Sequence, residues 1–482
     1  MAFTADADRI TPTVTPKVTM ASGLEAAPRS RRAITGWMLF DWAAQPFHTL
    51  LLTFFFARYF ATGVVGDGAE AQTLWGTMLA VTGILIAVMS PVLGAIADAV
   101  GPRKPWVALF TVLTIAGTAS LWIAVPGADA TTILLTLFAF GVAMVGVEFA
   151  AVFNNAMMTD LVPRERLGRL SGTSWALGYA GGVVVLLLVL ALVVEASPGA
   201  GRTLAGLAPI LGLADIPGGG DRFTGPLTAL WMAVFIVPFF LFTPDQPRRS
   251  GGWAKGTVDR AVRELLGTIR NLPRNRSLFS YLGSSMFYRD ALNGLYAFGG
   301  LYAGGVLGWG ATKLGIFGIL AAVAGVIGCL AGGRLDDRFG PKRVVATSIV
   351  ALALVSLAIV LTDRETALLV AVGPGTPWPD VVFYTCGALI GAFGGALQAA
   401  SRTLLTDQAE PGRMTEAFGL YALSGKATSF LAPALIAFVT GVVATGWLGL
   451  GSEDAQRLGI SPIVVLFAIG LALLPMVRAR VE

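Results

Sequence analysis

Charged and amide side chains stand inside long apolar runs of this sequence, where charge is costly. In the first run, Asp41, Gln45 and His48 are spaced at i, i+4 and i+7, which puts all three on one face of a helix. A histidine titrates near neutral pH, so His48, the only histidine in the chain, is a candidate to carry a proton. A satisfied hydrogen bond between helices is the alternative for His48.

The fourth apolar run contains Glu148, with Asn155 two helical turns later on the same face. Glu148 has no cation close to it in the sequence. A carboxylate buried in an apolar span without a nearby cation takes up a proton more readily than in water, so it can act as a protonation switch. The alternative is a structural ion pair with a cation from a distant part of the chain.

The seventh run and two later runs supply the other candidates for binding substrate or protons. These are Tyr288, Arg289, Asp290, Asn293, Gln398 and Lys426. Arg289 and Asp290 are adjacent and point in different directions, so they cannot simply neutralise each other along one face. We expect Asp290 to pair with Lys426, and Arg289 to pair with Asp41 or Glu148. Without that pairing, Lys426 could bind a substrate carboxylate.

The residues for metal and phosphate chemistry are missing. One histidine and two isolated cysteines, Cys329 and Cys386, cannot make a Cys/His metal cluster. The sequence has no phosphate-binding P-loop, so ATP-driven chemistry is not expected. We therefore expect no enzyme activity, no metal and no cofactor.

The elements that position these residues follow from the composition. Of the 482 residues, 55% are hydrophobic and 13% are charged, and the mean hydropathy is +0.73. Soluble domains carry roughly 25% charged residues. The chain is therefore predicted to be an all-α protein of the lipid bilayer. Its net charge of +5 is then a signal of topology and does not indicate a nucleic-acid partner.

We interpret about twelve apolar runs as membrane spans, since a helix needs about 20 residues to cross the hydrocarbon layer. The runs begin near Gly36, Thr73, Trp106, Thr131, Arg169, Phe223, Ser277, Ala311, Arg343, Asp380, Arg413 and Ser461. The connections after even-numbered spans carry many more cations than the others. By the positive-inside rule this side is cytoplasmic, and an even number of spans puts both termini there.

One charged turn occurs twice, as GAIADAVGPRK from Gly94 and as GGRLDDRFGPKR from Gly332. The matched positions are Gly94, Asp98, Gly101 and Arg103 in the first copy, and Gly333, Asp337, Gly340 and Lys342 in the second. A second echo pairs TDLVPRERLGRLSG with TDQAEPGRMTEAFG. We therefore predict two six-helix bundles, residues 33–243 and 277–482. A tail, residues 1–32, precedes them, and a linker with an amphipathic helix, residues 244–276, joins them.

These turns resemble the signature of the major facilitator superfamily, whose halves are related in this way. FDWAAQPF, MFYRDALNGLYAFGGLYA and GALQAASRTLL resemble its vacuole-effluxer-like branch more closely. The resemblance implies export of amino acids or movement of small metal-chelating organic molecules. Ala44-Gln45 and Arg289 stand where that branch has Asn-Ser and Asn, at positions where substrate would be recognised.

The resemblance also implies a role for the repeated turns. Asp98 would hold the two halves together while the cytoplasmic side is closed, facing the span that begins near Arg413. Asp337 would face the start of the fifth span. The alternative is that these turns serve solubility and topology only.

We therefore predict a secondary transporter of a small organic solute, such as an amino acid, that works by alternating access and is driven by protons. It would be a monomer in a bacterial inner membrane. A larger amphipathic solute, such as a siderophore or lipid, is one alternative. A transport-dead membrane scaffold is another.

Overall fold

The computed structural model describes residues 30–196, 199–247, 256–309, 311–373, 375–410 and 412–479. Almost all of the predicted tail therefore lies outside the described residues, as does part of the predicted linker. The first helix begins at Arg31, so Arg31 and Arg32 are helical and do not belong to a tail.

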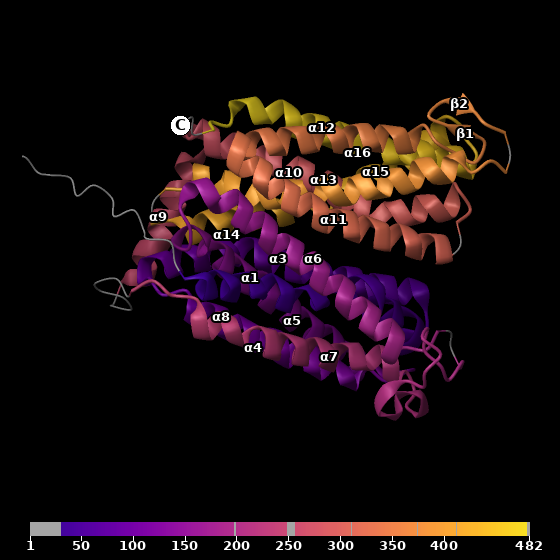
Figure 1. The fold of residues 1–482 in the computed structure, drawn as a ribbon, viewed down its shortest axis with the longest axis horizontal. Helices are drawn as coiled ribbons and strands as arrows, with labels where there is room; N and C mark the ends of the chain where they lie inside the picture. Colours follow the sequence, from indigo (N-terminus) through magenta and orange to yellow (C-terminus); the bar gives the residue numbers. More distant parts are fainter. Residues whose placement is uncertain are drawn as a thin grey trace, which may run out of the picture.

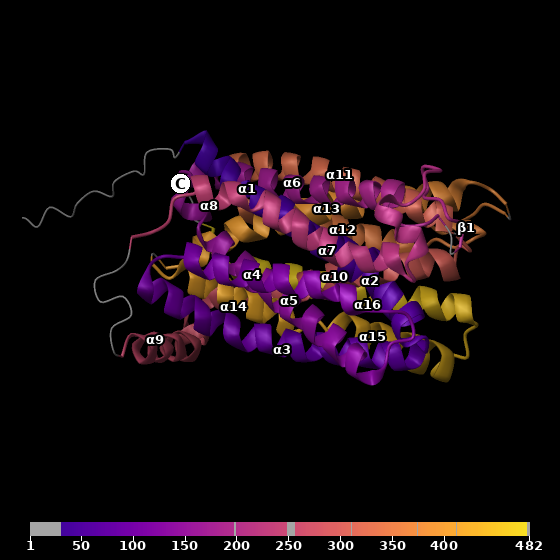
Figure 2. The same ribbon diagram turned by 90° about the horizontal axis from the view of Figure 1, so that it is seen from below.

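The first half of the chain is a bundle of long helices. They are α1 (Arg31–Pro46) with its continuation α2 (Phe56–Tyr59), α3 (Gly68–Val100), α4 (Lys104–Ser120), α5 (Ala130–Ala156), α6 (Leu167–Leu192), and α7 (Gly219–Phe235) with α8 (Val237–Phe242). The second bundle consists of α10 (Arg276–Gly305), α11 (Ala311–Phe339), α12 (Pro341–Val360), α13 (Trp378–Gln408), α14 (Met414–Ala427) with α15 (Leu431–Phe438), and α16 (Ser452–Leu473). A short hairpin, β1 (Thr366–Ala367) and β2 (Val370–Ala371), connects α12 and α13. Figure 1 shows the two bundles lying side by side along their length, and Figure 2 shows them from below.

Eleven helical segments of the described chain are long and apolar enough to cross a membrane. The thirty-residue α10 is not one of the eleven, and it carries Arg289 and Asp290. In chain order it is the seventh of twelve long segments. The all-α fold predicted from the sequence is confirmed, and the predicted starts lie within five residues of the observed ones except in the last span. That helix begins at Ser452 and not near Ser461, because its polar first turns are helical as well.

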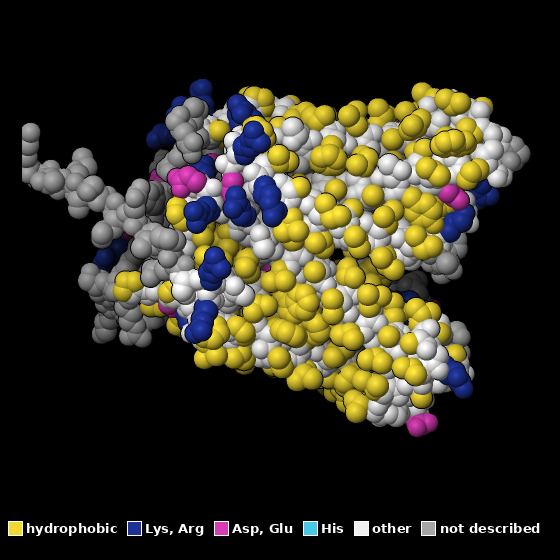
Figure 3. Space-filling model, in the orientation of Figure 1, with side chains coloured by type: hydrophobic (Ala, Val, Ile, Leu, Met, Phe, Trp, Pro, Cys, Tyr) yellow, Lys and Arg dark blue, Asp and Glu magenta, His cyan; other side chains and the backbone are white. Residues whose placement is uncertain are grey.

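Apolar side chains cover the outside of the bundles, as lipid contact requires. Figure 3 shows this surface, with lysines and arginines gathered at one end of the helices. We call this the basic end and the opposite end the open end. At the basic end Lys104 Nζ donates to the carbonyl of Thr243, and Lys342 Nζ donates to the carbonyl of Val477. Each lysine thus binds the backbone just after the last helix of its own bundle.

The repeated turn brings the two bundles into close contact at the basic end. A Cβ at Gly94 would lie 2.5 Å from the carbonyl oxygen of Thr415, and one at Gly333 would lie 2.5 Å from that of Gly168. Gly101 and Gly340 have φ of +108° and +83°, a region that favours glycine. The repeated glycines therefore allow close helix approach and a sharp turn.

The linker contains the helix α9 (Thr257–Asn271), which packs on α3. Ala261 and Leu265 are its buried residues, whereas Val258 and Ile269 are about 40% exposed. The sequence of this helix predicts an apolar stripe through Val258, Val262, Leu265 and Ile269, and the structure covers that stripe only in part. Arg413 Nη1 donates to Thr268 Oγ1 over 2.7 Å, which ties this helix to the start of α14.

Two spans that reach the centre of the molecule are interrupted. After Pro46 the first span continues as a π-helix, Phe47–Phe54, which contains His48. The eleventh span breaks between α14 and α15, one residue after Lys426, since α14 ends at Ala427 and α15 begins at Leu431. Such breaks free backbone groups and widen a helix, and they are frequent at functional sites.

Candidate functional site

A cavity of about 1670 Å³ lies between the two bundles and reaches the open end. Helices α1, α5 and α6 of the first bundle line it, together with α10, α11, α13 and α14 of the second. Figure 3 shows the hollow between the bundles at this end. Of the predicted binding residues, those that line it are Asp41, Gln45, His48, Glu148, Asn155, Arg289, Asn293, Gln398 and Lys426.

Asp41 on α1 forms an ion pair across the bundles with Arg402 on α13. Arg402 Nη1 lies 3.2 Å from Asp41 Oδ2, and Ser174 Oγ donates to the same oxygen over 2.6 Å. Arg402 is only 4% exposed and also donates to Asn155 Oδ1 over 2.9 Å. The prediction that Asp41 would pair with Arg289 is therefore wrong, because the cation paired with Asp41 is Arg402.

Glu148 on α5 pairs with Lys426 on α14, with 2.9 Å between Oε1 and Nζ. This is a second ion pair between the bundles. It contradicts both the expected pairing of Lys426 with Asp290 and that of Glu148 with Arg289. Glu148 therefore forms the structural ion pair with a distant cation that was considered as its alternative role.

Arg289 also lines the cavity, but unlike Arg402 and Lys426 it contacts a backbone carbonyl and an aromatic ring. Its Nη1 donates to the backbone carbonyl of Tyr421 over 2.8 Å, and its guanidinium carbon lies 4.0 Å from the centre of the Tyr421 ring. Within the described residues, Arg289 has no ion pair with a carboxylate. The group is therefore held in place by a carbonyl and an aromatic face.

Asp290 and Tyr288 are buried and do not line the cavity. Asp290 Oδ2 accepts a hydrogen bond of 2.7 Å from the backbone N–H of Ala432, in the first turn of α15. The hydroxyl of Tyr288 lies 2.8 Å from Ser401 Oγ. Asp290, a candidate for binding substrate or protons, therefore lies outside the cavity lining, and its carboxylate holds the helix that follows the break in the eleventh span.

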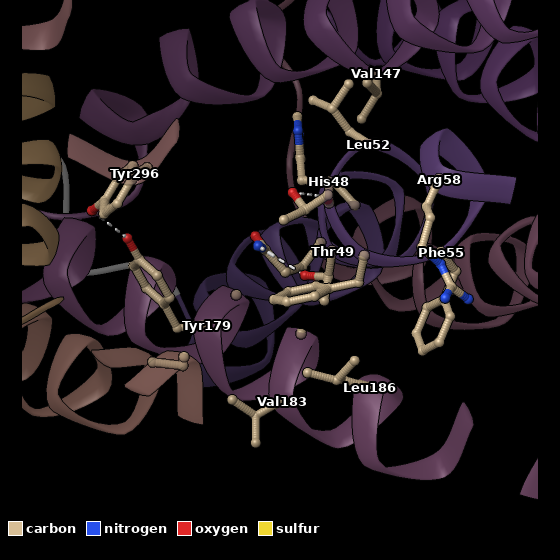
Figure 4. Close-up of a pocket in the computed structure, with 18 of the residues that line it drawn as sticks. His48, Thr49, Leu52, Phe55, Arg58, Val147, Tyr179, Val183, Leu186 and Tyr296 are labelled. Carbon is tan, nitrogen blue, oxygen red and sulfur yellow. Dashed lines mark hydrogen bonds between the residues drawn. The ribbon is translucent and has the colours of Figure 1, made fainter. Parts of the chain in front are cut away.

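The first span presents Gln45 and His48 to the cavity, on the face predicted from their spacing. Gln45 Nε2 lies 3.4 Å from Thr49 Oγ1. In the part of the chain that the structure describes, the His48 imidazole has no hydrogen-bond or ion-pair partner. The interhelical hydrogen bond considered for His48 is therefore not formed here. Figure 4 shows His48 and Thr49 beside the cavity.

A polar contact beside the cavity also joins the bundles. The hydroxyls of Tyr179 on α6 and Tyr296 on α10 are 3.3 Å apart (Figure 4). Gln398 Nε2 donates to the hydroxyl of Tyr179 over 3.0 Å. Sequence reasoning missed Tyr179. The spacing of Ser171, Trp175 and Tyr179, four residues apart each time, was an available signal for a polar face on this helix.

The basic end is closed by a network around Asp98. Asp98 Oδ2 accepts from the backbone N–H of Glu416 over 2.9 Å, and Oδ1 accepts from Thr415 Oγ1 over 2.7 Å. Arg103 is 2% exposed and donates to Asp98, Thr415 and Asp160. Asp98 thus lies at the N-terminus of α14, where the helix dipole favours an anion.

The second copy of the turn makes the related contact. Asp337 Oδ1 accepts from the backbone N–H of Arg169 over 3.0 Å, at the start of α6. Arg164 and Asp407 form a further ion pair across the bundles. Lys342 does not reach across, since its two hydrogen bonds go to the last residues of its own bundle. The aligned Arg103 and Lys342 therefore have different partners.

Comparisons with known proteins agree with this architecture. The family model described as "Vacuole effluxer Atg22 like" matches residues 70–481. The chain is 25% identical to "Uncharacterized MFS-type transporter YxiO" of Bacillus subtilis (strain 168) over 92% of this chain and 94% of that protein. It is also 25% identical to "Autophagy-related protein 22" of Coccidioides immitis (strain RS), over 44% of this chain and 37% of that protein. The crystal structure of the major facilitator superfamily transporter FucP in the outward conformation superposes with a TM-score of 0.65 at 15% identity, covering 92% of this chain and 97% of that one.

Proposed function

Because the chain belongs to the vacuole effluxer Atg22-like family, we propose that it carries a small organic solute, such as an amino acid, across the membrane by alternating access. One observation supports this above all. A cavity between two bundles is open at one end, while the Asp98 network closes the other. Breaking that network and closing the open end would expose the same cavity to the opposite side.

Proton coupling is part of the proposal. Two ion pairs cross between the bundles inside the cavity, Asp41 with Arg402 and Glu148 with Lys426. A proton taken up by either carboxylate would leave its cation without a counter-charge. Proton binding and rearrangement of the bundles would then be linked, and such linkage runs in both directions.

We further propose that the protein acts as a monomer in a bacterial inner membrane, with the basic end and both termini in the cytoplasm. The gathering of lysines and arginines at that end supports this orientation. A larger amphipathic solute is the second candidate, and the cavity of about 1670 Å³ favours it.

Flux measurements on the purified protein in liposomes test the proposal. A metabolite mixture is offered inside or outside, with and without a pH gradient, and the solutes that move are identified by mass spectrometry. We expect one class of small solute to move, and its movement to follow the pH gradient. Movement of amphipathic solutes alone would favour the second candidate, and movement of no solute would favour a scaffold.

A cross-linked variant tests whether transport requires the basic end to open. Arg164→Cys with Asp407→Cys places two thiols at an ion pair between the bundles. A short bifunctional thiol reagent should hold the basic end closed and stop flux, and cleaving the reagent should restore flux. Flux that persists after complete cross-linking would argue against alternating access.

A further inference from the structure

Arg289 is the one cation deep in the described cavity that forms no ion pair with a carboxylate. The deep part contains three cations, Arg289, Arg402 and Lys426, and two carboxylates, Asp41 and Glu148. Both carboxylates are paired, with Arg402 and with Lys426. One positive charge is left over.

The remaining acids that line the cavity lie toward its open end. Glu195 follows the end of α6, Asp215 precedes α7, and Asp221 is in the first turn of α7. Asp221 lies 3.6 Å from the exposed Arg58, and Glu195 accepts from the backbone N–H of Gly199. Within the described residues, none of the three acids forms an ion pair with Arg289.

The surroundings of Arg289 hold it in place for a ligand. The guanidinium lies over the ring of Tyr421 and against the backbone of Gly425, one turn later on α14. A Cβ at Gly425 would lie 2.5 Å from the Arg289 guanidinium carbon. The side chain thus fits into a space that only glycine leaves, and its planar fork suits a carboxylate.

An uncompensated charge at this depth in a membrane protein is unfavourable unless it has a ligand or water. A single spare positive charge matches a monoanion better than a dianion such as phosphate. No described acid of the deep cavity is free to bind an ammonium group. Apolar side chains form much of the wall, among them Phe418 and the Val147, Val183 and Leu186 seen in Figure 4.

We propose that the cavity binds an organic monocarboxylate with an apolar body, its carboxylate held by Arg289. This inference rests on the proposed transport function and narrows its substrate class from small organic solutes to monocarboxylates, with zwitterionic amino acids as weaker ligands. It implies that a solute with a carboxylate alone is preferred over a zwitterion or a cation of the same shape.

Binding to the purified protein tests this with a matched set of probes. The carboxylates are 4-methylpentanoate, hexanoate, octanoate and phenylacetate. L-leucine, L-leucinamide and 3-methylbutylamine supply the zwitterion, the cationic amide and the amine. Calorimetry should detect the carboxylates, with 4-methylpentanoate bound more tightly than L-leucine, and should detect neither the amide nor the amine. Binding of no carboxylate, or binding of L-leucine or a cation as tight as that of 4-methylpentanoate, would overturn the proposal.

Variants identify the residue. Arg289→Gln should weaken binding of the carboxylate by about 10- to 100-fold, the usual range for loss of a charged hydrogen bond. Gly425→Ala keeps the charge but displaces the guanidinium, and should weaken binding as well. Arg58→Gln removes a cation near the open end and should have no effect. Unchanged binding in Arg289→Gln, with Gly425→Ala also unchanged, would overturn the assignment.

The liposome experiment separates this inference from the proposed function. Carboxylate binding without any flux would reject the transporter and keep the site. Proton-driven flux of a solute that lacks a carboxylate would keep the transporter and reject the site.

Discussion

Glu148 and Lys426 form an ion pair that joins the two bundles inside the cavity. His48, Lys426 and Arg289 are all charged or titratable neighbours of this carboxylate. Neutralising Glu148 would therefore leave more positive charge around the cavity, which favours an anionic ligand. Proton binding at Glu148 and anion binding nearby would then reinforce each other.

We predict that Glu148→Gln abolishes accumulation of substrate against a gradient more than it abolishes counterflow. Glutamine has a similar shape but cannot take up the proton. With one proton per substrate, each pH unit of gradient supplies about tenfold accumulation, which the variant should lose. The measurement is uptake into liposomes with and without an imposed pH gradient.

Asp290→Asn is the matched control for that experiment. Its carboxylate accepts from Ala432 N and lies outside the cavity lining, and asparagine keeps an acceptor for this bond. We therefore expect normal coupling in this variant. Normal accumulation in Glu148→Gln would move the coupling proton to His48 or Asp41.

Residue spacing predicted one part of the site correctly and left another undetermined. The i, i+4, i+7 pattern placed Asp41, Gln45 and His48 on one face, and all three line the cavity. The adjacent Arg289 and Asp290 must point in different directions, but periodicity does not say which of them faces the cavity. Partners such as Arg402, 361 residues from Asp41, depend on how the bundles dock, which local sequence does not encode.

At the scale of elements, the repeated turn is where helix ends of one bundle meet helix starts of the other. Asp98 ends α3 and accepts hydrogen bonds at the start of α14, and Asp337 does the same at the start of α6. A carboxylate at a helix N-terminus is stabilised by free backbone N–H groups and by the helix dipole. The turn can therefore hold two helices together and release them when its charge is lost.

We predict that Asp98→Asn shifts the protein away from the state that is open at the open end. Losing the charge should cost the closed basic end about 1 to 2 kcal/mol, a change of about 5- to 30-fold in the population ratio. Spin-label distances across the open end would measure the two populations. Asp337→Asn, the symmetry-related change, is the comparison, and an unchanged distribution in both variants would contradict a locking role.

The breaks within the first and eleventh spans could not be predicted from the sequence. The repeated glycines and the run lengths predicted helix positions well, because both depend on local composition. The π-helix after Pro46 and the break after Lys426 depend instead on contacts made in the folded state. Asp290 shows the reason, since its bond to Ala432 stabilises the start of α15 across 142 residues of sequence.

At the scale of the whole molecule, charge is distributed unequally between the two ends. Lysines and arginines gather at the basic end, and apolar side chains cover the length between the ends (Figure 3). Chains insert so that loops rich in lysine and arginine stay in the cytoplasm. The open end of the cavity would then face the outside of the cell.

Cysteine labelling in intact cells tests this orientation. Arg103, at the repeated turn, is only 2% exposed, so a label there would not react. The side chain of Glu410, between α13 and α14 at the basic end, is 70% exposed, and that of Arg364, between α12 and α13 at the open end, is 52% exposed. The wild-type chain is a suitable control, because its two cysteines are both buried. We predict that a membrane-impermeant maleimide labels Arg364→Cys on intact cells, but labels Glu410→Cys only after the membrane is permeabilised. Labelling of Glu410→Cys on intact cells would instead place the basic end outside the cell. The Asp98 network would then close the outer entrance of the cavity and not the cytoplasmic one.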